Sequence, residues 1–300
     1  MISIVYNCDR RENGTAFLAR VALQESLGLK DRVVLDNQLK GFSESELYIH
    51  VDDGREDLQW ECPKPNAYWA IDTHLGYEYR LEKARQFDNI FVAQKECAAR
   101  MIKDGIKNVE WLPLACSPIA NPTKEELLDD TPEQVAAFGG PSVLTEQHSV
   151  VFCGHIESRS EDGFNDRVEY LDHLFREIPS CWLSHQLFFE EMAIRYIRGR
   201  LGFNISVKSD LNMRFFEVMS IGTALLTDSA AVGWDDIGYE DGKHFIGYTD
   251  MDDMVHKAKW ALRNPVERNA IALEGHQFTR DNHTYAHRMA HILDVAGIDF

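Results

Sequence analysis

Two series of short apolar stretches, separated by polar or helix-forming segments, run through this 300-residue sequence. The first series includes Ile2–Tyr6, Leu47–Val51 and Ile90–Val92, and the second includes Val150–Gly154 and Asn204–Val207. Short apolar strands that alternate with helices are typical of parallel sheets built from βαβ units. The sequence therefore predicts an α/β protein with two such series.

The character of the sequence changes between these two series. Residues 119–148 are rich in proline and glycine and hold an acidic run from Glu125 to Asp130, which is typical of a linker or a long loop with room for one short helix. We therefore expect a first domain at residues 1–118, a second at 149–280, and a last helix at 281–300.

Composition limits the classes of function. The net charge of −18 argues against broad affinity for nucleic acid or anionic membranes, although it leaves room for a local basic groove. No stretch is apolar for long enough to span a membrane. The six cysteines are scattered without a Cys-x-x-Cys motif, and the N-terminus lacks the features of a signal peptide. These features predict a cytoplasmic protein with reduced thiols.

The stretch from Ser209 to Asp228 combines a loop, a short helix, a glycine turn and a buried strand. Asp210 or Asn212 can cap the start of the helix, and Gly222 stands where helices commonly end in a left-handed residue. The strand after the helix leads to the carboxyl edge of a sheet, where open α/β folds bind ligands. The sequence therefore predicts a ligand site around this helix.

Arg214 and Glu217 lie three residues apart, so they share one face near the start of this helix. A cation beside a helix N-terminus suits a phosphate, and a carboxylate can accept hydrogen bonds from ribose hydroxyls. The alternative is a surface ion pair, which is common at this spacing. Spacing alone leaves both interpretations open.

A second candidate for phosphate binding is Val150–Gly154, a strand that delivers a glycine and is followed by a polar loop and by Arg159 and Arg167. In a strand–glycine–loop–helix unit, backbone N–H groups can meet an anion. The alternative for each arginine is a solvated helix face.

Asp72 and His74 follow the apolar strand that we expect at Ala67–Ile71. Polar groups at the carboxyl end of a parallel strand face the ligand edge of the sheet, and a histidine there can act as an acid or a base. We therefore predict that both residues are catalytic or contact the molecule that accepts the group transferred at this edge. The alternative is that Asp72 caps the next segment and His74 is merely exposed.

The run from Asn212 to Asp228 resembles the "NMR-FE-(small)-G-LLTD" segment of glycosyltransferases of the GT-B fold, in particular the CgeB-like, spore-maturation group. Residues 69–74, 87–95 and 108–115 are similar to further stretches of that group, namely "W-x-x-D-x-H", "F-D-x-V-F-(V/T)-x-(Q/N)-K" and "V-x-W-L-P-L-A". The resemblance implies two Rossmann-like domains that face a cleft, with C-terminal helices that cross back to the first domain.

The resemblance also implies roles for individual residues. Glu217 would hold the ribose of a nucleotide sugar, and basic residues would contact its diphosphate. Arg200, four residues before Asn204, stands where the group usually has a lysine. Related enzymes often carry a second Glu eight positions before the first, where this sequence has Ser209. The residues expected to bind the donor are Gly154, Arg167, Arg200, Asn212, Arg214, Glu217 and Gly222.

The activity implied by the resemblance is transfer of a sugar from a nucleotide-sugar donor, a UDP-sugar, with retention of configuration and with no required cofactor. His283, His287 and His291 have a spacing that can bind zinc, but neither a metalloprotease Glu nor a nearby Cys accompanies them, so we predict no metal site. Two alternatives stay open. One is a catalytically degenerate protein that binds a nucleotide or a partner, and the other is a glycosyltransferase that acts on modified bases of DNA.

Overall fold

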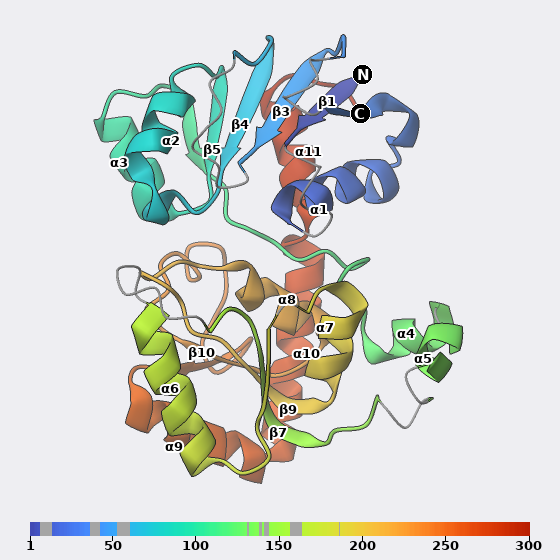
Figure 1. Cartoon of the computed structure of the whole chain (residues 1–300), viewed down its shortest axis with the longest axis vertical. Coiled ribbons are helices and arrows are strands. Elements are labelled where there is room, and N and C mark those ends of the chain that lie inside the picture. The colour runs from blue at the N-terminus through green and yellow to red at the C-terminus, as the bar shows by residue number, and fades with distance from the viewer. Residues whose placement is uncertain are drawn as a thin grey trace. The chain divides into compact units, whose positions relative to one another are not determined.

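The computed structural model describes residues 1–6, 14–36, 43–52, 61–130, 132–137, 140, 144–156, 164–185 and 187–300 (Figure 1). It divides into two compact units. The first consists of Met1–Ala115 together with Tyr285–Phe300, and the second is Cys116–Thr284. No helix in the described part of the chain is long and apolar enough to cross a membrane.

The first unit is built on a six-stranded sheet in the order β2-β1-β3-β4-β5-β6, and all of its strand pairs are parallel. Its carboxyl ends therefore share one edge, as in other doubly wound sheets. The strands are β1 (Ile2–Val5), β2 (Val33–Asp36), β3 (Leu47–Val51), β4 (Asn66–Ala70), β5 (Asn89–Val92) and β6 (Val109–Trp111).

The helices of the first unit include one from the end of the chain. They are α1 (Thr15–Val21), which continues as a π-helical turn at Ala22–Ser26, α2 (Tyr77–Ala84), α3 (Lys95–Lys103) and α11 (Tyr285–Val295), with short 3-10 helices at Lys30–Arg32 and Thr73–Leu75. In α11, Arg288 donates from Nε to the Pro113 carbonyl at 2.9 Å, and the ring of Tyr285 packs on Trp69. The expected return of the C-terminus to the first half of the fold is thus confirmed for α11.

The second unit is built on a five-stranded sheet in the order β11-β10-β9-β7-β8, again with all strand pairs parallel. Its hydrophobic core includes Val150, Leu201 and Leu226 from three adjacent strands. The strands are β7 (His148–Cys153), β8 (Trp182–Ser184), β9 (Gly199–Phe203), β10 (Leu225–Asp228) and β11 (Ile246–Tyr248).

Helices flank both faces of this second sheet. They are α4 (Lys124–Asp130), α5 (Pro132–Ala137), α6 (Phe164–Glu177), α7 (Phe189–Ile197), α8 (Met213–Ile221), α9 (Met251–Arg263) and α10 (Pro265–Asn282). Helix α6 packs with α9, whereas α8 packs with α7 and α10, and the two groups lie on opposite sides of β7 and β9 in Figure 1. The two sheets confirm the α/β class and the two Rossmann-like halves.

The structure corrects one predicted strand. The expected strand at Asn204–Val207 is wrong, because the strand is β9 and residues 204–207 lie in the loop that follows it. Gly199 and Gly202 hid β9 from the sequence pattern, since glycine weakens a strand. Both glycines have a packing reason: an added Cβ at Gly202 would lie 2.4 Å from Val218 Cγ1, and one at Gly199 would lie 2.7 Å from Val151 Cγ2.

The segment at residues 119–148 also differs from the expectation. It holds two short helices, α4 and α5, rather than at most one. Leu127, Val135 and Leu144 are buried in a small apolar cluster that also contains Ile194 of α7. Part of this segment is therefore packed on the second unit instead of running free as a loop.

Candidate functional site

Helix α8 begins and ends with the signals that the sequence offered. Of the two candidate caps, Asn212 is the one used, since its side chain accepts a hydrogen bond from the Phe215 backbone N–H at 3.3 Å. Gly222 ends the helix with a φ of 90°, which is left-handed backbone that glycine adopts without a Cβ clash. The first turn of α8 therefore lies beside the carboxyl edge of the second sheet, and Gly222 lies at the far end of the helix.

The loop that leads into α8 contains a strained turn. Lys208 and Ser209 have φ values of 50° and 60°, and the Asp210 N–H donates to the Val207 carbonyl at 3.1 Å. Two successive left-handed residues form a type I′ turn, which usually contains glycine or asparagine. Non-glycine residues there cost on the order of 1–3 kcal/mol each and persist only where the surroundings hold them. Here the Ser209 carbonyl also accepts from the Val232 N–H at 3.0 Å, which ties two loops of this edge together.

Arg214 and Glu217 form an ion pair below the surface. Nε of Arg214 lies 3.5 Å from Oε2 of Glu217, and the side chains are 20% and 6% exposed. Burial raises the pKa of the Glu217 carboxyl, and the nearby arginine opposes that rise. Among the described residues the terminal nitrogens of Arg214 and the second carboxylate oxygen of Glu217 have no hydrogen-bond partner. The pair therefore keeps donors and an acceptor that a ligand can use.

Gly154, at the end of β7, makes room for the guanidinium of Arg214. A Cβ at Gly154 would lie only 2.8 Å from Nη1 of Arg214. Two arginines lie over the ring of Phe152, with Cζ of Arg214 at 5.9 Å and Cζ of Arg167 at 5.7 Å from the ring centroid. The structure thus brings together three of the predicted residues, Gly154, Arg167 and Arg214.

Arg167 is held at this edge by two backbone carbonyls. It donates to His155 O at 2.9 Å and to Ile205 O at 3.2 Å. Burial, together with the charge of Arg214, lowers the pKa of Arg167 to about 10. Two like charges near one another in a partly desolvated place are unfavourable unless an anion joins them. This pair is the strongest sign of an anion site in the second unit.

Other predicted donor residues lie elsewhere. Arg200 is the second residue of β9, so it lies near the amino edge of the sheet, and it pairs with Glu146 at 3.5 Å. It lines a separate cavity of about 390 Å³ that Gly222 and His276 also line. The structure therefore does not bring Arg200 together with Gly154, Arg167 and Arg214, and the resemblance that placed it at the diphosphate gave no information on its position in the fold.

Sequence reasoning did not select Ser206 and Asp228, although they belong to the same edge as Arg167. Oδ1 of Asp228 accepts from the Ser206 N–H at 2.7 Å, and its Oδ2 accepts from the Ser206 hydroxyl. Burial raises the pKa of Asp228, and its hydrogen bonds to Ser206 oppose that rise. The signal that could have found Asp228 is an aspartate that ends a strand just after the apolar run Ala224–Leu226.

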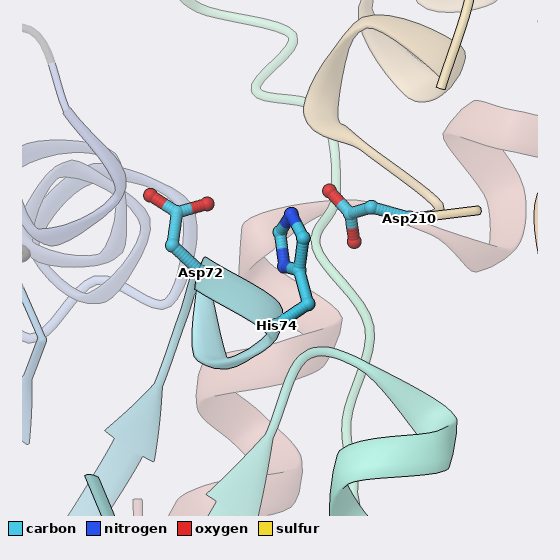
Figure 2. Close-up of side chains that lie close together, drawn as sticks. All are labelled: Asp72, His74 and Asp210. Carbon is cyan, nitrogen blue, oxygen red and sulfur yellow. The ribbon is translucent and has the colours of Figure 1, made fainter. Parts of the chain in front are cut away.

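In the first unit, Asp72 and His74 lie directly after β4 (Figure 2). Asp72 has left-handed backbone, with a φ of 51°, and its side chain makes no capping bond to the short helix that holds His74. Gln94, at the end of β5, accepts from the Thr73 N–H at 2.9 Å and so ties this turn to the next strand. The side chains of Asp72 and His74 are half-buried. Figure 2 also labels Asp210, which belongs to the second unit.

A buried ion pair supports this turn from the same unit. Nε of Arg80 in α2 lies 2.5 Å from Oδ2 of Asp52, which also accepts from the Tyr68 hydroxyl at 3.0 Å. Arg80 donates in addition to the Gly76 carbonyl, at the end of the turn, at 3.2 Å. Breaking a buried pair by removing one partner is strongly destabilising, so this network fixes the turn rather than binding a ligand.

Comparison with known proteins gives a family match for one part of the chain and a shared fold for almost all of it. Residues 161–294 match the model of the glycosyl transferase-like family. A search of curated proteins finds no match.

Solved structures with low sequence identity share the fold over almost the whole chain. HepE of Anabaena, in complex with UDP and glucose, has a TM-score of 0.66 at 9% identity and 99% coverage of each chain. An α-glucosyltransferase, in complex with UDP and a 13-mer DNA that contains an HMU base, has a TM-score of 0.64 at 11% identity and 99% coverage of each chain. A glycosyltransferase of Rickettsia africae has a TM-score of 0.61 at 7% identity, with 98% of this chain and 97% of that chain covered.

The family match covers the part of the chain that holds Arg167, Arg214, Glu217 and Asp228, and the fold comparison extends to both sheets. Residues 161–294 therefore form a glycosyl transferase-like region within a chain that has the GT-B fold of glycosyltransferases.

Proposed function

We propose that this chain transfers a sugar from a nucleotide-sugar donor, a UDP-sugar, and that the second unit binds the donor. The observation that carries the proposal is the pair of arginines on Phe152, beside Gly154 at the carboxyl edge of the sheet. Glu217 pairs with Arg214, and Asp228 favours the charged form of Arg167, whereas Arg214 disfavours that form. The UDP complexes of two proteins with the same fold add support for the choice of nucleotide.

The chemistry of the leaving group fits these residues. When the bond from the sugar to the diphosphate breaks, negative charge grows on the departing diphosphate. Preformed cations in a place with little water stabilise such developing charge and can do so without a metal ion. Arg167 and Arg214 would have this role, and Glu217 would accept hydrogen bonds from the ribose hydroxyls with its open oxygen.

We assign the acceptor side to the first unit, with Asp72 and His74 as the residues of the chemical step. His74 can transfer a proton, and the half-buried Asp72 can orient an acceptor hydroxyl. The left-handed backbone of Asp72 supports this assignment, since strained residues cluster at functional sites. The domain limits that we propose are residues 1–118 for the acceptor side and 149–280 for the donor side.

The finer assignments rest on sequence resemblance. We place the chain in the CgeB-like group and expect retention of the anomeric configuration, although Ser209 replaces the usual first Glu. We also propose a cytoplasmic location, because none of the five described cysteines forms a disulfide, as expected of a reducing compartment.

The direct test compares two arginines of the second unit, Arg214 in α8 and Arg200 in β9. Arg214→Gln should weaken UDP binding by about tenfold to a hundredfold, because a charged hydrogen bond contributes about 1.5–3 kcal/mol. Arg200→Gln is the matched control, since that residue lies near the amino edge and should leave the affinity unchanged. Isothermal titration of UDP into both variants and the wild type decides the matter. Equal losses in the two variants, or no loss in either, would contradict a donor site at Arg214.

One alternative is that the acceptor is a modified base in DNA. It is favoured by the shared fold with an α-glucosyltransferase that was solved with DNA, whereas the net charge of −18 opposes it. A DNA mobility shift that weakens steeply with salt would support this acceptor.

A second alternative is a degenerate protein that binds a nucleotide without transfer, which Ser209 in place of the usual Glu favours. Slow hydrolysis of a UDP-sugar separates the two ideas. Wild-type hydrolysis that Glu217→Gln abolishes indicates an active site, and binding without any turnover indicates degeneracy.

A further inference from the structure

Asp228 is a buried carboxylate at the end of β10 that the proposed reaction does not use. Its exposed fraction is only 8%, and it accepts hydrogen bonds from both the backbone N–H and the hydroxyl of Ser206. Thr227 also directs its hydroxyl at Oδ1, at 3.5 Å. All of these hydrogen-bond partners are neutral, so any cation near Asp228 acts on it through space or through the segment that they share.

Arg167 contacts the same short segment of chain that Asp228 holds. Ser206 directly follows Ile205, and the Ile205 carbonyl accepts from Nη2 of Arg167 at 3.2 Å. The neighbouring Asn204 is fixed in turn, since its carbonyl accepts from the Tyr248 hydroxyl at 2.9 Å. Asp228 and Arg167 therefore bind neighbouring residues of one segment: the carboxylate accepts from Ser206, and the guanidinium donates to the Ile205 carbonyl.

Electrostatics agrees with this geometry. Asp228 favours the charged form of Arg167, whereas burial and Arg214 disfavour it and lower the pKa of Arg167. Among the described residues, Asp228 shifts the pKa of Arg167 of α6 and that of Tyr248 of β11, which is raised by burial first and then by Asp228. Among these described neighbours, Arg167 is the cation.

We propose that Asp228 is a positioning residue of the donor site, a resident counter-charge that shares Arg167 with the diphosphate and so limits how tightly the nucleotide product is held. This proposal rests on the proposed function. Without a ligand, the carboxylate compensates Arg167 and fixes the segment that holds it. When a diphosphate binds, the like charge of Asp228 opposes it, which weakens binding and speeds release.

The test is removal of the charge with the shape kept. Asp228→Asn retains an oxygen that can accept from the Ser206 N–H but carries no charge. We expect UDP and inorganic pyrophosphate to bind about tenfold more tightly at low ionic strength, mainly through slower dissociation, and the gain to shrink as salt is added. The gain should also fade as the pH falls through the raised pKa of Asp228, because the wild type then loses the same charge.

Two controls separate charge from structure. Ser206→Ala removes the hydroxyl partner and leaves the charge, so it should not tighten binding. In an Arg167→Gln background, Asp228→Asn should have no effect, because the shared cation is gone. If Asp228→Asn does not fold, Asp228→Ser, which also removes the charge, is titrated instead.

Three results would overturn the proposal: unchanged or weaker binding by the charge-free variant, a gain that persists without Arg167, or an equal gain in Ser206→Ala. If UDP binds the wild type and Arg214→Gln weakens it, such a result removes only the role of Asp228. If the wild type binds neither UDP nor pyrophosphate, the donor site itself is wrong and the role of Asp228 falls with it.

Discussion

Glu217 is the residue whose assignment depends most on its surroundings. A surface ion pair and a ribose contact are both compatible with its spacing from Arg214, and a sequence contains no information on solvent exposure. The structure shows a carboxylate that is 6% exposed, with one oxygen toward Arg214 and the other without a partner in the described chain. Burial of this kind makes each contact more valuable, since water cannot replace it.

Substitution of Glu217 should therefore affect binding of the ribose but not binding of the diphosphate. We predict that Glu217→Gln weakens the binding of UDP by about tenfold to a hundredfold, because a charge-assisted hydrogen bond to the ribose is lost. Binding of inorganic pyrophosphate, which has no ribose, should not weaken. Titration of both ligands into a variant with unchanged circular dichroism checks this, and a parallel loss for both would place Glu217 at the phosphates.

Asp72 and His74 are predicted to act in the chemical step and not in donor binding. Asp72→Asn and His74→Ala should lower turnover by about 10²–10⁴, the usual contribution of a positioned acid or base, and leave the affinity for UDP unchanged. Leu75→Ala, in the same turn and 40% exposed in the wild type, is the matched control. Hydrolysis of the UDP-sugar can serve as the assay until an acceptor is known. Normal turnover in both variants would show that other residues carry the reaction.

The elements of the fold differ in how well periodicity reveals them. β3 coincides with the predicted Leu47–Val51, because an apolar run marks it. β9 has the sequence Gly-Arg-Leu-Gly-Phe, in which two glycines mask a central strand.

Close packing of β9 against α8 leads to a prediction about stability. Gly202→Ala should cost about 1–3 kcal/mol of unfolding free energy, because its Cβ would lie 2.4 Å from Val218 Cγ1 in a closed core. Combining it with Val218→Ala should cost less than the sum of the two single changes, since the second removes the atom that clashes. Urea denaturation of the four proteins gives the coupling energy. Strict additivity would mean that the backbone of β9 moves instead of the side chain.

On the scale of the whole chain, resemblance between short motifs predicted more of the architecture than the periodicity of apolar residues did. The motifs identified the GT-B fold, which the solved structures confirm at identities too low for ordinary comparison. The motifs could not predict how the charged groups at the carboxyl edge of the second sheet act on one another. Arg167, Arg214 and Asp228 come from different elements and meet only after folding. A role for Asp228 in particular follows only from its burial and its hydrogen bonds to Ser206, which the sequence does not contain.

Stability of the molecule should depend on pH through its buried histidines. Burial lowers the pKa of four of them, His50, His148, His244 and His276, and most strongly for His50, which is 1% exposed. The unfolded chain has an ordinary histidine pKa of about 6.5 and takes up protons below it, whereas the folded chain does not. The stability is therefore intact above about pH 6.5 and falls progressively as the pH drops below that value.

His50 offers the clearest test of this dependence, because its unit can be followed by itself. We predict that His50→Asn lowers stability at pH 8 through lost packing against Tyr68 and Phe87, but makes stability less dependent on pH between about 6.5 and 5. Amide hydrogen exchange read in β3 and β4 reports on the first unit, and exchange in β9 and β10 serves as the internal control, since His50 lies in β3. The pH dependence in β9 and β10 should stay as in the wild type, because His148, His244 and His276 remain in the second unit. An unchanged pH dependence in β3 would mean that His50 already takes up its proton in the folded state.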